Sequence, residues 1–426
     1  MTLLATYRLL TKVLRPAVPA FLHWRETRGK EDARRIGERL GYASINRPAG
    51  RLAWLHGASV GEGLALLPVV ERLIASGFRV LVTSGTVTSA AILASRLPPG
   101  AQHQYVPVDA PLYIKRFLDH WEPDLVMVAE SEIWPNMICA VHERGIPFIL
   151  VNARMSPRSF QRWLKFPGFI GDILARMDLC LAQTHDDAMR LMQLGAPRVQ
   201  VCGNLKFDVP APPYSTAALA QMSAAIGNRP VWFAASTHDG EEEIALEVHR
   251  KLLARFPNLL TIVAPRHVPR GGAIADMALR NGIEPSLRSR GDQITPATGF
   301  YIADTMGEMG LFYRLTSIVF VGKSLGGARG GQNPIEPAKL GCVVLHGPDV
   351  GNFEEVYRHL TLANGSTEIL NAAMLERALQ VFLSDPALLR RNGRAAKDAV
   401  ENLSGATDCI MQTLEPWLLQ LQTENR

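Results

Sequence analysis

The chain has 426 residues, with 45 Lys and Arg against 40 Asp and Glu, and a formal net charge of +5. A hydrophobic share of 47% and a charged share of 20% are typical of a globular protein of two or three domains, and exclude a disordered chain and a polytopic membrane protein. Residues 1–40 hold nine bases and four acids and so carry the whole net charge, which argues against a protein that coats nucleic acid.

The first forty residues predict an amphipathic helix at a membrane surface. They contain no run of about 20 apolar residues, as a spanning helix needs, and charges interrupt the place of a signal peptide's apolar core. At about 100° per residue an apolar and a basic face form; they hold Leu3, Tyr7, Leu10 and Leu14, and Arg8, Lys12 and Arg15. Pro16 and Pro19 are expected to break the helix before the aromatic segment 21–24. Such faces suit anionic lipid; the alternative is a helix that packs on the protein's own body.

From residue 51 the chain alternates short apolar runs with helical patterns, which predicts parallel sheets covered by helices. In the first half strands are expected at 51–56, 78–83, 125–129, 147–152 and 179–183, and helices at 64–76, 89–96, 134–144 and 185–194. After a proline-rich linker at 209–214, strands are expected at 231–235, 259–264, 318–321 and 343–345, and helices at 241–256 and 334–340. The sequence therefore predicts an α/β protein of two doubly wound, Rossmann-like halves facing a cleft, with ligands beyond the carboxyl ends of the strands.

The five cysteines are odd in number and contain no C-x-x-C pair. This pattern argues for a reducing compartment and against a disulfide scaffold or a zinc site. Buried small hydrophobic residues are the expected role. They are Cys139, Cys180, Cys202, Cys342 and Cys409.

The turn at 56–63 places a carboxylate, Glu62, just after the first predicted strand. Its glycine spacing, G-x-x-x-G-x-G, is not the dinucleotide fingerprint, and no acid ends the second strand, which disfavours a nicotinamide dehydrogenase. Ser59 and Glu62 also have the spacing of a capping box, so a purely structural role is the alternative.

A second carboxylate pair, Glu130 and Glu132, follows the strand at 125–129. Carboxylates beyond a strand end are costly to bury, and could serve as an acid or base or stabilise positive charge. The alternative is that Ser131 or Glu132 caps a helix that starts near Pro135. A metal pair is disfavoured because the chain has no D-x-D and no His lies nearby in sequence.

Two further polar turns end the first half. Segment 152–156 contains Arg154 and follows a predicted strand. Segment 203–208, just before the linker, contains Lys206. A lysine there would face the cleft and could meet an anion; a solvated lysine is the alternative.

The strongest signal of the second half is the run 322–336, which has five glycines in its first ten residues. Its start resembles the end of a Walker A motif, but Ser317 occupies the place of the required glycine and glycines follow instead of a helix, so it is not a P-loop. Glycine-rich backbone N–H groups that lead to a helix N-terminus near 333–334 favour anion binding, with Glu336 placed for ribose hydroxyls. Polar segments at 236–241, 265–267 and 304–308 accompany this run. A transferase that moves a group from a nucleotide to a membrane-located acceptor would use every part.

These motifs together resemble the 3-deoxy-D-manno-octulosonic acid (Kdo) transferases of lipopolysaccharide synthesis over roughly residues 30–420. The motifs are 56–63, ESEIWPN at 130–136, NARMS at 152–156, GNLKFD at 203–208, STHDGEE at 236–242, APRH at 264–267, DTMGE at 304–308 and GGQNPIEP at 330–337. The resemblance implies a GT-B fold, CMP-Kdo as donor and a lipid A precursor (tetraacylated lipid IVA) as acceptor. A single inverting displacement is the expected mechanism, and the lack of metal-ligand spacing predicts that it needs no metal or cofactor. The resemblance also implies the cytoplasmic face of a bacterial inner membrane, and no nucleic-acid partner.

The resemblance also assigns roles by position. Glu62 matches the general base, and Glu130 and Lys206 match positions that stabilise the transition state. The CMP-binding positions are matched by Pro265, Arg266, Met306, Gly307, Glu308, Asn333, Pro334, Ile335 and Glu336. Additional site candidates are His56, Ser59, Gly61, Arg154, Ser236, Thr237, Lys323, Gly330 and Gly331. Departures from the usual pattern include Gly57-Ala58, Ser131 in place of Thr, and Lys323 in place of Gly, which adds a cation near the phosphate.

The expected domains are a basic membrane-associated segment at 1–40, an acceptor-binding domain at 41–208, a linker at 209–217, a CMP-sugar-binding domain at 218–400, and a C-terminal helix at 401–426 that packs back on the first domain. Two rival functions remain at this point: a GT-B enzyme that uses a UDP-sugar, and a non-catalytic membrane-associated binding protein.

Overall fold

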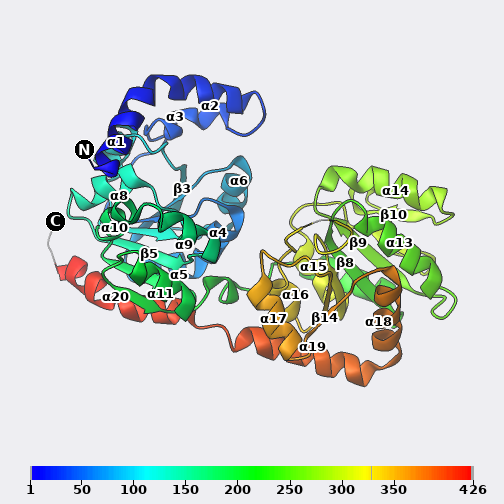
Figure 1. Ribbon diagram of the computed structural model, residues 1–426. Helices are drawn as coiled ribbons and strands as arrows, with labels where there is room; N and C mark the ends of the chain where they lie inside the picture. Colours follow the sequence, from blue (N-terminus) through cyan, green and yellow to red (C-terminus); the bar gives the residue numbers. More distant parts are fainter. Residues whose placement is uncertain (1, 328, 424–426) are drawn as a thin grey trace. The chain divides into compact units, whose positions relative to one another are not determined.

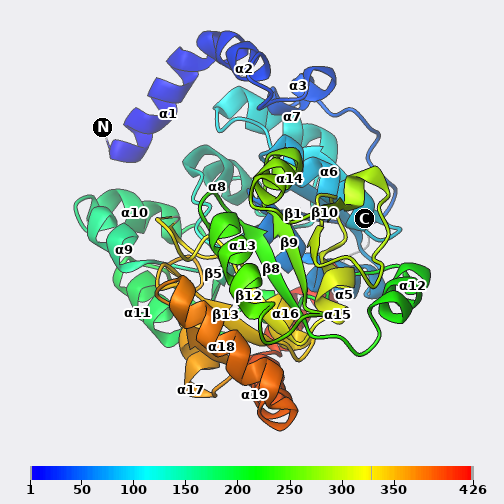
Figure 2. The ribbon, with the colours of Figure 1, turned by 90° about the vertical axis from the view of Figure 1, so that its right-hand side faces the viewer.

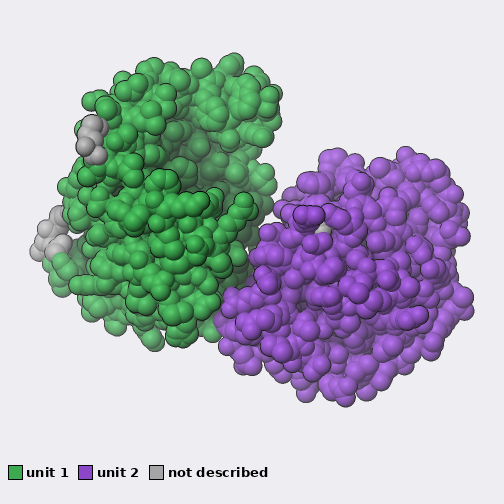
Figure 3. Space-filling view, in the orientation of Figure 1, with its two compact units in different colours: residues 1–209, 404–426 green, residues 210–403 purple. Residues whose placement is uncertain are grey.

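The computed structural model describes residues 2–327 and 329–423. The chain divides into two compact units (Figures 1 and 3). Unit 1 comprises residues 1–209 and 404–426, and unit 2 comprises residues 210–403. The change of unit thus falls at the start of the predicted linker.

Unit 1 is built on a seven-stranded sheet in the order β3-β2-β1-β4-β5-β6-β7, with all neighbours parallel. The strands are β1 (Leu52–His56), β2 (Arg79–Ser84), β3 (Ala101–Tyr105), β4 (Leu125–Ala129), β5 (Phe148–Ala153), β6 (Leu179–Ala182) and β7 (Val199–Val201). Strand β4 is buried along its whole length, and its side chains alternate between two apolar cores, one on each face. This double burial explains why the strand is a continuous apolar run.

The helices of unit 1 cover both faces of that sheet (Figure 1). They are α1 (Leu3–Leu14), α2 (Val18–Glu26), α3 (Ile36–Arg39), α4 (Val60–Ala65), α5 (Leu67–Ala75), α6 (Val87–Arg96), α7 (Pro111–Trp121), α8 (Pro135–His142), α9 (Pro157–Trp163), α10 (Pro167–Leu174), α11 (His185–Gln193) and α20 (Ala406–Thr423). The single helix predicted at 64–76 is two helices, α4 and α5. Pro68 stands in the first turn of α5, where its missing N–H is not needed.

The N-terminal segment is helical past the point where a break was predicted. Pro16 lies in a 3₁₀ turn at Arg15–Ala17, and Pro19 lies in the first turn of α2. The first helix thus ends at Leu14, just before Pro16, as predicted, but a second helix follows at once because a first turn tolerates the missing N–H of Pro19. None of the helices within the described part of the chain combines the length and apolar character needed to cross a bilayer.

The C-terminal helix α20 belongs to unit 1, where Ile410 and Leu414 are fully buried in the core beside α5. The prediction of unpaired cysteines is wrong for Cys202 and Cys409, which form a disulfide between the end of β7 and α20. They stand 207 residues apart, but the packing of α20 brings their Cα atoms to 5.4 Å. The disulfide also removes the cysteine-based argument for a reducing compartment. The remaining cysteines, Cys139, Cys180 and Cys342, are buried and free as predicted.

Unit 2 holds a second seven-stranded parallel sheet, in the order β10-β11-β9-β8-β12-β13-β14 (Figure 2). The strands are β8 (Val231–Thr237), β9 (Leu260–Pro265), β10 (Pro285–Leu287), β11 (Phe300–Ile302), β12 (Ile318–Val321), β13 (Val343–His346) and β14 (Ser366–Glu368). The helices are α12 (Thr216–Ile226), α13 (Glu241–Leu252), α14 (Gly271–Arg280), α15 (Met309–Arg314), α16 (Ile335–Lys339), α17 (Glu354–Leu362), α18 (Ala372–Ser384) and α19 (Pro386–Glu401).

The strand order reverses at one point in each sheet. In unit 1 the first strand, β1, lies between β2 and β4; in unit 2 the first strand, β8, lies between β9 and β12. Ligands of open α/β sheets bind beyond the carboxyl ends of the strands at such switch points. The loops after β1 and β4, and after β8, β9 and β12, are therefore the places to look for sites.

Candidate active site

Glu62 lies at the switch point of unit 1, in the first turn of α4. The Ser59 hydroxyl accepts a hydrogen bond from the Glu62 N–H at 3.3 Å and donates to Glu62 Oε1 at 2.7 Å. The other carboxylate oxygen accepts from the Ala58 N–H at 2.9 Å. The capping box considered as an alternative is therefore present, and it also fixes the carboxylate in one orientation. Gly61 lies in the same first turn.

Two further pairs of charged or ionisable groups of unit 1 gather near Glu62. Lys206 Nζ donates to Glu130 Oε1 at 2.6 Å, and their side chains are only 24% and 15% exposed. His56 Nε2 lies 3.8 Å from Glu132 Oε2 and has no hydrogen-bond partner among the described residues. The sequence motifs around 56, 62, 130 and 206 thus come together at the ends of β1 and β4.

Burial raises the pKa of Glu62 above its ordinary value. Hydrogen bonds from Ser59 and Ala58 oppose this shift, and the negative charges of Glu130 and Glu132 add to it. A carboxylate with a raised pKa is a stronger base than an ordinary glutamate, which is the property a general base needs.

Backbone geometry around Glu130 is unusual. Glu130 has φ +57° and Asn152 has φ +50°, in the left-handed region that residues other than glycine rarely adopt. Asn152 Oδ1 accepts from the Leu205 N–H at 3.0 Å and so holds the turn that carries Lys206. Strain of this kind clusters at functional sites, where the surrounding structure over-determines it. Asn152 is thus a positioning residue whose contact with 205 only the fold reveals.

The second carboxylate turn is anchored differently from the capping alternative. The Ser131 hydroxyl donates to the Arg154 carbonyl, and Glu132 accepts from the Trp134 indole N–H at 2.7 Å, so neither caps α8. The first N–H groups of α8 instead donate to the buried carboxylate of Asp109, at 3.1 Å and 2.9 Å. Asp109 was missed because it lies more than twenty residues from the motif. Arg154 has an exposed side chain.

In unit 2 the loops after β8 and β12 are joined by one buried carboxylate, Glu241. It is 1% exposed and accepts from the N–H groups of His238, Lys323, Ser324 and Leu325 at 2.7–3.0 Å. The predicted role of the glycine-rich run needs correction here: the anion bound by the N–H groups of 323–325 is the protein's own Glu241. Gly322 is required at this point, because a Cβ there would lie 2.6 Å from the Ser236 carbonyl oxygen.

The later part of the run turns through glycines and ends in a short helix. Gly330 and Gly331 have φ +109° and +65°, and Asn333 Oδ1 accepts from the Ile335 N–H at 3.0 Å. Pro334 and Ile335 are buried, which gives them a packing role, whereas Glu336 is half-buried and accepts from Asn333 at 3.3 Å. Residue 328 of this run lies outside the described residues.

The segments after β9 and β11 supply the other predicted donor-binding residues. Pro265 ends β9 and is buried, while Arg266 is exposed. Met306 is 70% exposed and Gly307 has φ +84°. Glu308 forms a two-pronged ion pair with Arg288, at 2.6 and 3.0 Å. This ion pair lowers the pKa of Glu308, so its carboxylate is ionised. Arg288 was missed, since no motif surrounds it.

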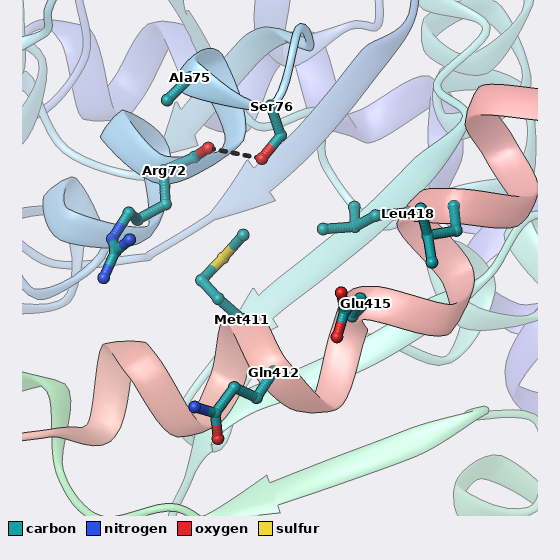
Figure 4. A pocket seen from close by; sticks show the side chains of 8 residues that line it. Arg72, Ala75, Ser76, Met411, Gln412, Glu415 and Leu418 are labelled. Carbon is teal, nitrogen blue, oxygen red and sulfur yellow. Dashed lines mark hydrogen bonds between the residues drawn. The ribbon is translucent and has the colours of Figure 1, made fainter.

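A pocket between α5 and α20 of unit 1 (Figure 4) contains none of the predicted site residues. It is lined by Arg72, Ala75, Ser76, Met411, Gln412, Glu415, Leu418 and Leu419. Within the described ranges no group of three or more His, Cys, Asp or Glu side chains is placed to hold a metal ion.

Two parallel Rossmann-like units, each with polar side chains at its switch point, define the GT-B class of fold and confirm the predicted fold class. A solved glycosyltransferase from Rickettsia africae has this fold, with a TM-score of 0.59 and 13% identity, covering 89% of this chain and 100% of that one.

The sequence comparisons then give the family. A family model described as 3-deoxy-D-manno-octulosonic-acid transferase matches residues 34–209. A probable mitochondrial 3-deoxy-D-manno-octulosonic acid transferase from Arabidopsis thaliana is 35% identical, over 96% of this chain and 93% of that protein. The 3-deoxy-D-manno-octulosonic acid transferase of Haemophilus influenzae is 32% identical, over 97% and 98%. The chain belongs to the Kdo transferase family and is a glycosyltransferase, as the motifs predicted.

Proposed function

We propose that this protein transfers Kdo from CMP-Kdo to a lipid A precursor, tetraacylated lipid IVA, by an inverting displacement that needs no metal ion. The observation that carries the proposal is the constellation of Glu62, Glu130 and Lys206 at the switch point of unit 1. A fixed, desolvated carboxylate can deprotonate a hydroxyl, and an ion-paired lysine beside it can stabilise charge. A protein that only binds its ligand would need neither group.

In this mechanism Glu62 takes the proton of the attacking sugar hydroxyl, and the new bond forms at the anomeric carbon as the bond to the CMP phosphate breaks. The electron pair leaves with the phosphate, and Arg266 of unit 2 supplies positive charge to the donor. Glu130 and Lys206 stabilise charge in the transition state. The Arg288–Glu308 ion pair shapes the donor-binding segment 304–308.

The decisive experiment is incubation with CMP-Kdo and tetraacylated lipid IVA, followed by mass spectrometry of the lipid. A product heavier by one or more Kdo residues is expected, and their number reports how many transfers occur. Unchanged lipid in the presence of a folded, CMP-binding protein would contradict the proposed acceptor.

The donor nucleotide can be tested without an acceptor. We expect CMP to bind in an isothermal titration and UDP to bind at least about tenfold more weakly, a difference of about 1.4 kcal/mol. Arg266→Ala should weaken CMP binding, whereas Arg280→Ala, at an exposed arginine of α14, should not. Equal or tighter binding of UDP would favour a UDP-sugar donor.

The pH profile of transfer should reflect the raised pKa of Glu62. The base must be ionised, so the rate should fall as the pH drops through a value above the ordinary pKa of a glutamate, 4.5. Glu132→Gln removes one of the charges that raise this pKa and should move the acid limb of kcat/KM to lower pH. If the acid limb of this variant lies at the same pH as that of the parent, the group that titrates in the profile is not Glu62.

We also propose that the N-terminal helices bind the surface of the bacterial inner membrane on its cytoplasmic side. Apolar side chains of α1 and α2 are about half exposed or more: Leu3, Leu9, Leu10, Val13, Leu14, Phe21 and Trp24. Exposed bases, among them Lys12 and Arg28, flank them. Of the predicted apolar face, Tyr7 differs, because its hydroxyl donates to Asp109 Oδ2 at 3.0 Å within unit 1.

Point variants test the membrane contact better than deletion, because Leu4 and Leu22 are buried in unit 1. Val13 is 65% exposed, so Val13→Asp should leave the fold intact and lower partitioning onto phosphatidylglycerol vesicles by about tenfold. Leu362→Asp, at a side chain of unit 2 that is 73% exposed, is the matched control and should sediment with vesicles like the parent. Equal partitioning of both variants would contradict the proposed surface.

A further inference from the structure

A cluster of cationic and polar side chains stands at the switch point of unit 2, apart from the residues assigned to the nucleotide. His238 follows β8, His267 follows β9 and Lys323 follows β12, the three neighbouring strands at the centre of the sheet (Figure 2). Glu241 Oε2 accepts from the N–H groups of both His238 and Lys323, at 2.8 and 2.7 Å. One carboxylate oxygen therefore holds these two backbones side by side.

The His238 ring contacts the His267 ring and the side chain of Gln332, which fix its orientation. His238 and His267 meet edge to face, with centroids 5.7 Å apart. His238 Nε2 lies 3.2 Å from the side-chain nitrogen of Gln332. With the Gln332 amide donating to Nε2, the proton of a neutral His238 ring is on Nδ1, where it is available to an acceptor.

The cations near His238 outnumber the carboxylates that are available to pair with them. Asp239 and Glu242 are both paired with Arg270, at 2.8 and 3.1 Å. Glu241 uses its oxygens on backbone N–H groups. Lys323 and Arg266 form no ion pair with any carboxylate in the part of the chain that the structure describes. Burial lowers the pKa of His238, and the nearby Lys323, His267, Arg266 and Arg270 add to this shift.

The backbone of Lys323 lies in the left-handed region, which a lysine rarely adopts. Its φ is +58°, and that of Ser236 at the end of β8 is +55°. A glycine adopts such values without strain, whereas a lysine rarely does. Position 323 thus holds a cation although its backbone conformation would suit a glycine better.

We propose that His238, His267 and Lys323 form a carboxylate-binding subsite for the sugar of the donor. This inference rests on the proposed function and deepens it. An octulosonic acid linked to CMP carries two anions, the phosphodiester and the sugar carboxylate. The exposed Arg266 serves the phosphate, and the Lys323 ammonium and the His238 and His267 rings donate to the carboxylate. The subsite would select an acidic sugar over the neutral sugars of most nucleotide donors.

The test compares the affinities of CMP and CMP-Kdo for the full chain by calorimetry at pH 8, without acceptor. Both ligands then carry about two negative charges, because the second ionisation of a phosphate monoester lies near 6. A general loss of positive field would therefore weaken both ligands, whereas loss of a carboxylate subsite weakens only CMP-Kdo.

Lys323→Asn removes the charge while keeping a residue that tolerates positive φ. We expect it to raise the Kd for CMP-Kdo about tenfold and to change the Kd for CMP less than twofold. His238→Gln should act in the same direction, Lys323→Arg should retain the affinity of the parent, and Arg280→Ala should affect neither ligand.

Three outcomes would overturn the subsite or its basis. An equal loss for CMP and CMP-Kdo would assign Lys323 to the nucleotide phosphate instead. Unchanged affinities in both variants, with parent-like thermal unfolding, would show that the cluster binds no part of the donor. Failure of the parent itself to bind either cytidine ligand would instead contradict the proposed function.

Discussion

Glu62→Gln is expected to lower the rate of Kdo transfer by about 10²–10⁴-fold, because an amide cannot take the proton of the attacking hydroxyl. The side-chain oxygen of Gln can still accept from the Ala58 N–H, the bond that now orients the carboxylate at 2.9 Å. Binding of CMP, which we assign to unit 2, should therefore stay near that of the parent. The measurements are initial rates with lipid IVA and a CMP titration of the same preparation.

A second variant separates catalysis from capping at this turn. Ser59→Ala removes the hydroxyl that accepts from the Glu62 N–H and donates to Glu62 Oε1, but it keeps the carboxylate and the Ala58 N–H that holds its other oxygen. It should cost about 1 kcal/mol of unfolding free energy and retain most of the transfer rate. Parent-like turnover in Glu62→Gln, or a loss in Ser59→Ala as large as in Glu62→Gln, would contradict the role of Glu62 as base.

Thermal unfolding gives an independent check. The folded state raises the pKa of Glu62, so it disfavours the ionised carboxylate, and stability increases as the pH falls through the raised value. Near pH 7 Glu62→Gln should therefore unfold at a temperature equal to or above that of the parent. Lower activity with unchanged or higher stability is expected of a group placed for chemistry rather than for folding.

The central strands could be predicted from the sequence because parallel strands that are covered on both faces are continuous apolar runs. The buried runs at 125–129 and 318–321 were predicted with the bounds that the structure has. Strand β3, with the sequence AQHQY, was missed because it pairs with a neighbour on one side only and its first residues are half-exposed and polar. Edge strands need no apolar run, so periodicity does not reveal them.

Within the candidate site, the sequence predicted the residues that lie in motifs but not the residues that position them. Glu62, Glu130 and Lys206 lie in turns of distinctive composition, but the residues that position them are far away in sequence. Asp109 is 27 residues from Asn136, to whose N–H it binds, and Asn152 is 53 residues from Leu205. The glycine-rich run predicted anion binding, but nothing in its composition indicated that the N–H groups of 323–325 bind the protein's own Glu241. The Cys202–Cys409 disulfide is the same case at a separation of 207 residues.

The pair of Lys206 and Glu130 allows stability and catalysis to be separated. Lys206→Met breaks an ion pair of 2.6 Å that is largely buried and leaves Glu130 without its cation. We expect a loss of about 2 kcal/mol in unfolding free energy, less than for a fully buried pair because both side chains retain some exposure. We also expect transfer to fall by about 10²–10³-fold, as when one preorganised charge-stabilising donor is removed.

The double variant Glu130→Gln/Lys206→Met decides between a structural and a catalytic reading of that loss. Removing both charges leaves no uncompensated carboxylate, so the free energy of unfolding should return toward that of the parent. Gln keeps the shape of Glu at a position with φ +57°, so the backbone strain is unchanged. If the pair only supports the fold, activity will return with stability; if it acts on the reacting groups, as we propose, the double variant will be stable and still nearly inactive. Denaturant unfolding and initial transfer rates on the three variants give the answer, and recovery of both quantities together would remove Lys206 and Glu130 from the mechanism.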